Sequence, residues 1–185
     1  MVTIVSLWLP IIAATVGVFF TSFLMWMVLP HHRKDFGKVP DEDGLMDTLR
    51  SQSAGPGQYM FPCCEDQEQM KDPDFMKKFA DGPSGILIIR PTGGFNMGKS
   101  MFQSTTFNLA ISICVAYVAT FTLAAASSGM EIFRLTGTVA FLAYAAGLGW
   151  GAIWWSRSWS STLKEMFDGL VYGIVTGLVF MALWP

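Results

Sequence analysis

The chain has 185 residues, of which 52% are hydrophobic and 14% are charged, and its mean hydropathy is +0.43. This composition is too apolar for an ordinary soluble domain. The formal net charge of -2 argues against a surface that attracts nucleic acid or anionic lipid, so the sequence predicts a membrane protein without a nucleic-acid partner.

Residues 1–30 contain no ionisable side chain. At a rise of about 1.5 Å per residue, such a run crosses the roughly 30 Å of hydrocarbon in a bilayer. A cleaved signal peptide has a basic start and a shorter apolar core, whereas this run is long and is followed by "LPHHRK". Residues 1–30 are therefore predicted to form the first transmembrane helix and to stay in the protein.

Residues 31–102 hold nine of the 12 Lys and Arg residues and eleven of the 14 Asp and Glu residues. Asp41 is a helix-start signal before "GLMDTLR", and Asp72 with Pro73 is a second one before "FMKKFADG". The runs "QYMF" and "GILIIR" have the composition of short strands. We expect a small α+β domain in the order helix, strand, helix, strand, whose core is too small to be stable alone.

Three further apolar runs, residues 103–126, 132–155 and 167–184, are predicted to be transmembrane helices two to four. The predicted fold class is an all-α polytopic membrane protein, with four transmembrane helices and a small α+β cytoplasmic insertion between the first and second. With residues 31–102 inside, eleven Lys and Arg residues are cytoplasmic and only Arg134 is outside. This asymmetry predicts that both termini lie outside, in a bacterial inner (plasma) membrane.

The stretch "GGFNMGKS" matches the phosphate-binding pattern G-x-x-x-x-G-K-[ST], with Gly93, Gly98, Lys99 and Ser100 as the pattern residues. A nucleotide site of this kind also needs a parallel sheet and an acidic residue that holds Mg²⁺. The following helix is a predicted membrane span, and no later strand ends in an acid. We interpret the stretch as a glycine turn and an interfacial lysine at the start of a span, and nucleotide binding as the disfavoured alternative.

Cys63 and Cys64 are adjacent in the predicted cytoplasmic domain, where thiols are normally reduced. Together with His31 and His32 they are candidate ligands for a soft metal such as Cu(I) or Hg(II). The vicinal pair resembles that of small mercury-uptake membrane proteins in this one feature, although the number of spans and the placement of the cysteines differ. The alternatives are a turn with buried thiols, and histidines that anchor the end of the first span at the headgroups.

Small residues recur every four positions in two predicted spans. This spacing is typical of a glycine zipper, which lets two membrane helices approach closely. The two stripes either face each other within one bundle, or one faces outward and joins protomers or a larger membrane complex. The candidate helix-packing residues are Gly169, Gly173 and Gly177 in the fourth span and Ala143, Gly147 and Gly151 in the third.

No ionisable residue is predicted near the middle of a span, and Asp168 is expected to pair with Arg157 or Lys164. No complete catalytic constellation is present, so neither an enzyme activity nor a cofactor is predicted. The sequence predicts a non-enzymatic protein of the lipid bilayer that acts by assembly, as a homo-oligomer or as an accessory subunit bound to other membrane subunits. The alternative hypothesis is soft-metal uptake or sensing through the vicinal cysteines.

Overall fold

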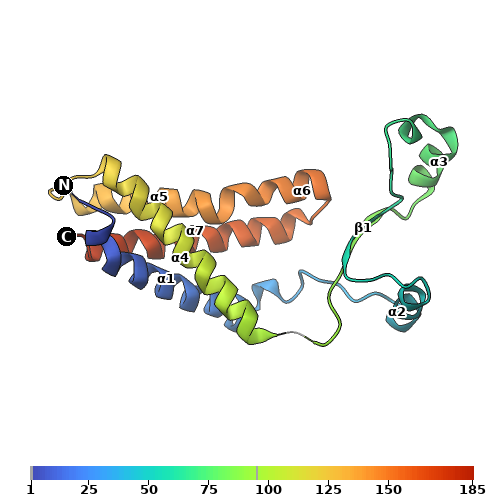
Figure 1. Cartoon of the computed structure of the whole chain (residues 1–185), viewed down its shortest axis with the longest axis horizontal. Helices are drawn as coiled ribbons and strands as arrows, with labels where there is room; N and C mark the ends of the chain where they lie inside the picture. Colours follow the sequence, from blue (N-terminus) through green and yellow to red (C-terminus); the bar gives the residue numbers. More distant parts are fainter. Residues whose placement is uncertain (1, 95) are drawn as a thin grey trace. The chain divides into compact units, whose positions relative to one another are not determined.

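A computed structural model of the protein describes residues 2–94 and 96–185 (Figure 1). These residues form two compact units. The helical unit comprises residues 2–37 and 96–185, and the second unit comprises residues 38–94. The insertion predicted between the first and second spans is therefore a compact part of its own.

The helical unit contains four helical stretches that are each long and apolar enough to cross a membrane, as the sequence predicts. Each has 24 to 27 residues. They are Val5–Val28, Met97–Thr122, Gly129–Trp155 and Trp159–Ala182. The last begins eight residues earlier than the predicted span, because the polar residues of its first two turns are helical as well.

Two of these stretches change helix type along their length. The first consists of α1 (Trp8–Phe23) and a π-helical turn over Leu24–Val28. The third consists of α5 (Gly129–Ala145) and α6 (Gly149–Trp155), joined by a short 3-10 turn. The second and fourth stretches are the uninterrupted helices α4 (Met97–Thr122) and α7 (Trp159–Ala182).

The helix ends follow from the local sequence. Asn96 caps α4 because its side-chain oxygen accepts a hydrogen bond from the backbone N–H of Lys99 at 2.9 Å. Ser128 and Glu131 form a reciprocal capping box at the start of α5. Ser156 adopts a left-handed conformation with φ 52°, which ends α6 and lets the chain return as α7. As a result, α1 and α5 run in one direction and α4 and α7 in the other (Figure 1).

The closest packing in the helical unit is between α5 and α7, and it depends on glycine. A Cβ atom added at Gly169 would lie 2.7 Å from the Cβ of Ala145, and one added at Gly173 would lie 2.8 Å from the carbonyl oxygen of Gly137. A Cβ added at Gly177 would lie 2.8 Å from the ring of Phe133. Any larger side chain at these three positions forces the helices apart.

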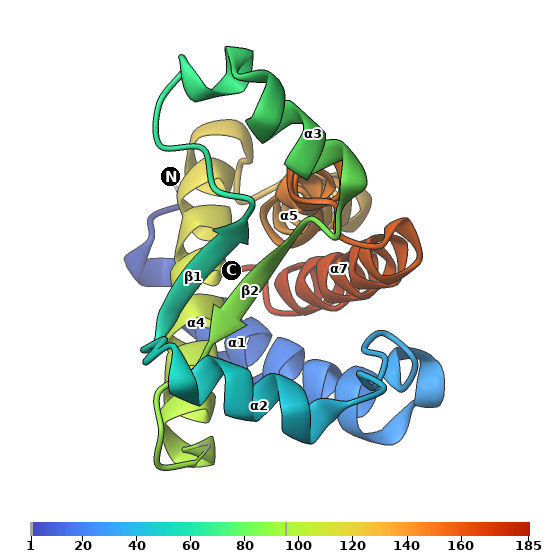
Figure 2. The same cartoon turned by 90° about the vertical axis from the view of Figure 1, so that its right-hand side faces the viewer.

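The second unit contains α2 (Glu42–Ser51), β1 (Gly57–Phe61), α3 (Pro73–Asp81) and β2 (Gly85–Ile89) in the predicted order. Asp41 and Asp72 cap the two helices, which confirms both predicted helix starts. The strands pair antiparallel, with Gly57 opposite Ile89 and Phe61 opposite Gly85, as the ribbon in Figure 2 shows. Two strands are far fewer than a nucleotide-binding sheet has.

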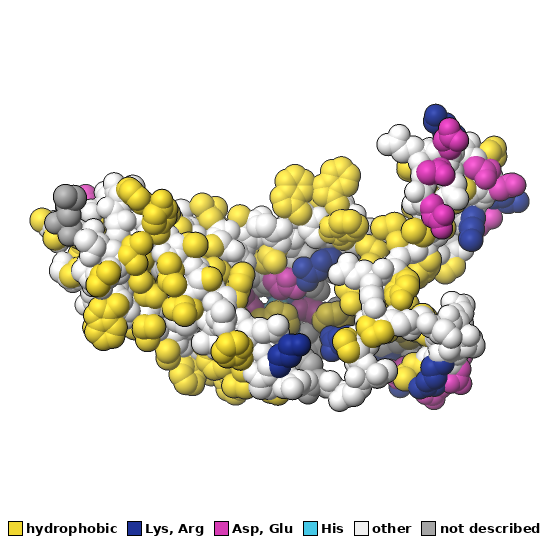
Figure 3. Space-filling view, in the orientation of Figure 1, with side chains coloured by type: hydrophobic (Ala, Val, Ile, Leu, Met, Phe, Trp, Pro, Cys, Tyr) yellow, Lys and Arg dark blue, Asp and Glu magenta, His cyan; other side chains and the backbone are white. Residues whose placement is uncertain are grey.

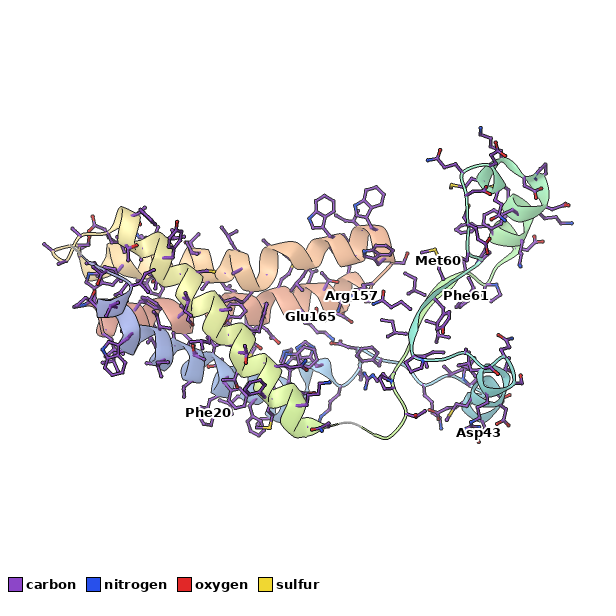
Figure 4. The ribbon with its side chains drawn as sticks, in the orientation of Figure 1. Phe20, Asp43, Met60, Phe61, Arg157 and Glu165 are labelled. Atoms are coloured by element: carbon purple, nitrogen blue, oxygen red, sulfur yellow. The ribbon has the colours of Figure 1, made fainter. Side chains whose placement is uncertain are left out.

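The two units differ in the side chains that they expose. Large apolar side chains lie exposed along the helical unit, whereas Lys, Arg, Asp and Glu gather on α2 and α3 (Figure 3). Neither α2 nor α3 buries a residue, and Met60 and Phe61 on β1 are each 45% exposed (Figure 4). The second unit therefore has little core, in agreement with the expectation from its size.

Candidate functional site

A group of ionisable side chains lies at one end of the helical unit, where the first helical stretch ends. It consists of His31, His32, Asp35, Lys164 and Asp168, and we call it the histidine–aspartate cluster. The first three residues follow the first stretch in the chain, and the last two lie on α7. The cluster therefore joins residues that are more than a hundred positions apart in the sequence.

The local backbone presents the first three side chains. Leu29 is extended, and Pro30 then begins a single 3-10 turn that continues to His32. The turn is closed by hydrogen bonds from the backbone N–H of Arg33 to the carbonyl of Pro30, and from that of Asp35 to the carbonyl of His32, both at 3.1 Å. Proline favours such a turn because its fixed φ suits the first helical position.

Asp168 lies in the third turn of α7, and its side chain is only 2% exposed. Its two carboxylate oxygens face two imidazole rings. Oδ1 lies 3.0 Å from Nε2 of His31, and Oδ2 lies 2.8 Å from Nε2 of His32. A buried carboxylate is costly unless it is hydrogen-bonded, and the two histidines are its hydrogen-bond partners.

His32 contacts a carboxylate through each of its ring nitrogens. Nδ1 lies 2.5 Å from Oδ2 of Asp35, on the opposite side of the ring from Asp168. Burial lowers the pKa of His32, but the hydrogen bonds with Asp35 and Asp168 outweigh it, so that the pKa is raised above its ordinary value. Both ring nitrogens of His32 therefore lie within hydrogen-bond distance of a carboxylate oxygen.

Asp35 is held in turn by Lys164, whose Nζ donates a hydrogen bond to Oδ1 at 2.5 Å. This bond, with that from His32 as the second cause, lowers the pKa of Asp35 to about 2. The indole of Trp26 covers one face of His32, with ring centroids 3.9 Å apart and planes inclined by 5°. The hydrogen bond to Asp35 and the stacking on Trp26 both limit how far the ring of His32 can turn.

The cluster borders a hollow of about 510 Å³ with an almost entirely apolar lining. His31 and Lys164 are the two members of the cluster that reach it. The side chain of His31 is 26% exposed, so the cluster is accessible from this side. The remaining lining residues are Met25, Leu29, Pro30, Leu163 and Phe167.

The partners expected for Asp168 differ from those in the structure. Lys164 pairs with Asp35, and Arg157 pairs with Glu165, two side chains that lie together at the beginning of α7 (Figure 4). The expectation was wrong because it considered only basic residues near Asp168 in the sequence. The sequence did not reveal that the "HHRKD" turn packs against α7, where His31 and His32 contact Asp168.

The vicinal cysteines belong to the second unit, whereas His31 and His32 belong to the helical unit. Cys63 is exposed and Cys64 is partly buried, and both are free thiols. The Sγ of Cys64 donates a hydrogen bond to the backbone carbonyl of Asp66 at 2.7 Å. Soft-metal binding by the cysteine pair remains a prediction.

The residues of the phosphate-loop pattern are divided between the two units. Gly93 has φ 107° and belongs to the second unit, whereas Gly98, Lys99 and Ser100 lie in the first turn of α4. The side chain of Asn96 already accepts the hydrogen bond of the Lys99 amide, one of the groups that a phosphate loop offers to phosphate. The sheet before it has two antiparallel strands. These contacts support the interpretation of the stretch as the capped start of a helix.

The two small-residue stripes have different surroundings. The glycine stripe of α7 packs against Phe133, Gly137, Phe141 and Ala145 of α5. None of these four residues belongs to the small-residue stripe predicted for the third span. Ala143 and Gly147 are exposed, and a Cβ added at Gly147 would have no atom within 4 Å. Gly151 gives room to the side chain of Arg157. The two stripes therefore do not face each other.

Comparisons of the chain with protein families, with curated proteins and with solved structures find no match.

Proposed function

We propose that the chain is a multi-pass protein of a bacterial inner membrane, with residues 31–102 in the cytoplasm and both termini outside. The support is the length and hydropathy of the four helical stretches, together with their exposed large side chains such as Trp8, Phe20 and Trp154. The excess of Lys and Arg in residues 31–102 supports the orientation.

We propose further that the protein acts by assembly and not as an enzyme, either as a homo-oligomer or as an accessory subunit of a larger membrane complex. The observation that carries this proposal is the exposed stripe of Ala143 and Gly147. Leu142 and Trp150, which flank it in the sequence, also have exposed apolar side chains. Small side chains on the surface of a helix let a second helix approach closely and gain dispersion contacts, which lipid chains provide less well.

The experiment compares Gly147→Leu with Val16→Leu, which introduces the same side chain at another exposed apolar position, on α1. Both variants are cross-linked in native membranes and then purified in a mild detergent for mass determination. Gly147→Leu should reduce the fraction of assembled protein, whereas Val16→Leu should leave it unchanged. A wild-type protein that is monomeric and has no companion in native membranes contradicts the proposal.

A further inference from the structure

We propose that His31, His32 and Asp168 form a binding site for one divalent first-row transition-metal ion such as Zn²⁺ or Fe²⁺. This inference goes beyond the proposed assembly, because none of the three ligand residues belongs to the Ala143 and Gly147 stripe. It also differs from the soft-metal hypothesis, because it uses no thiolate.

The geometry of the three side chains is the first argument. Each offers one ligand atom, and these atoms lie within 4.8 Å of one another. Ligand atoms about 2.0–2.2 Å from a common ion are at most roughly 4.4 Å apart. Small side-chain rotations therefore suffice to close the set on one ion, with both imidazoles using Nε2 and Asp168 using a carboxylate oxygen.

The second argument is the way in which His32 is oriented. Histidines that bind metals usually donate their second ring N–H to a carboxylate, which fixes the tautomer and makes the other nitrogen a better ligand. Asp35 occupies this position on Nδ1 of His32, and Lys164 fixes Asp35. With Nδ1 protonated, a metal ion takes the place of the proton on Nε2, and that proton leaves to solvent. Stacking on Trp26 holds the ring in the same plane.

The ligand types and their number indicate the class of ion. Two imidazoles and one carboxylate suit borderline divalent ions of the Fe²⁺ to Zn²⁺ group, whereas Cu(I) and Hg(II) prefer sulfur and Ca²⁺ and Mg²⁺ prefer oxygen. Three protein ligands leave at least one coordination position for water or another small ligand. The partly exposed His31 and the adjacent hollow give access to the site.

The experiment uses the full-length protein, purified in detergent without a histidine tag and treated with a chelator. Co²⁺ is added as a visible-absorption probe, and Zn²⁺ is then used to displace it. The expected result is a saturable Co²⁺ spectrum with one ion per chain, lost in Asp168→Asn and weakened at least tenfold in His31→Gln. Asp35→Asn should weaken binding about 10- to 100-fold, as is usual for the outer partner of a ligating histidine.

Two control variants locate the binding. Glu165→Gln removes another carboxylate of α7, one that pairs with Arg157, and should leave the Co²⁺ affinity unchanged. The double variant Cys63→Ser, Cys64→Ser should also bind as wild type does. Absence of saturable Co²⁺ binding in the wild type overturns the proposal and leaves a purely structural ion-pair cluster. Equal affinities of wild type and His31→Gln, a change at a partly exposed side chain that is expected to preserve folding, overturn it as well.

Discussion

Replacing Gly173 by alanine tests whether the contact between α5 and α7 depends on the absence of a side chain. The new Cβ would lie 2.8 Å from the carbonyl oxygen of Gly137, 3.0 Å from the Cβ of Phe141 and 3.1 Å from its backbone nitrogen. These atoms belong to the backbone of α5 or are attached to it directly. They cannot rotate away, so the two helices must separate.

The expected loss of stability follows from two opposing effects. Overpacking a tight contact costs about 1–3 kcal/mol. Alanine in place of glycine regains roughly 0.5–1 kcal/mol within a helix. The two ranges leave a net loss of roughly 0–2.5 kcal/mol, centred on about 1 kcal/mol. A loss of about 1 kcal/mol corresponds to a fall in Tm of roughly 2–4 °C for a chain of this length.

The matched control is Gly147→Ala, because a Cβ at Gly147 meets no atom within 4 Å. Gly147 lies in the 3-10 turn between α5 and α6, where an added Cβ causes no overpacking, so the Tm of this variant should be close to that of the wild type. Tryptophan fluorescence during heating, at one scan rate and in one detergent, measures all three proteins. A Gly173→Ala protein at least as stable as the wild type would refute the argument that Gly173 sets the spacing of these helices.

Three further outcomes are expected. In metal-free protein, Asp35→Asn should lower the free energy of unfolding by roughly 1–3 kcal/mol, because Lys164 and His32 lose a charged partner, and denaturant titration measures this loss. If the vicinal cysteines bind soft metal, the change of Cys63 and Cys64 to serine should abolish tight Cu(I) binding in a competition assay, and equal affinities would discard that hypothesis. Lys99→Ala should leave the binding of ATP and GTP analogues as in the wild type, and a loss of nucleotide binding would contradict the interpretation of "GGFNMGKS" as a helix cap.

The elements with strong local signals could be predicted from the sequence. These elements are the helix caps at Asp41 and Asp72, the apolar runs of the four spans and the two short strands. Each depends only on hydropathy and on residues close in the sequence, so one sequence is enough to predict it. The start of the fourth helix was less accessible, because "WSSTLKEM" is polar enough to resemble a loop although it is helical. This boundary decides how deep in a helix Asp168 lies.

The sequence by itself determined the class of the protein: four apolar helices of spanning length, a small charged insertion and its local caps, because hydropathy and helix-start signals are properties of short segments. Only the tertiary structure decided which side chains meet. His32 contacts Asp35 within one turn, a spacing that was visible in "HHRKD", but its contact with Asp168 spans 136 positions and depends on how α7 packs beside the first stretch. The same packing covers Gly173 and leaves Gly147 open, since two stripes with equal spacing differ only in the direction that each faces.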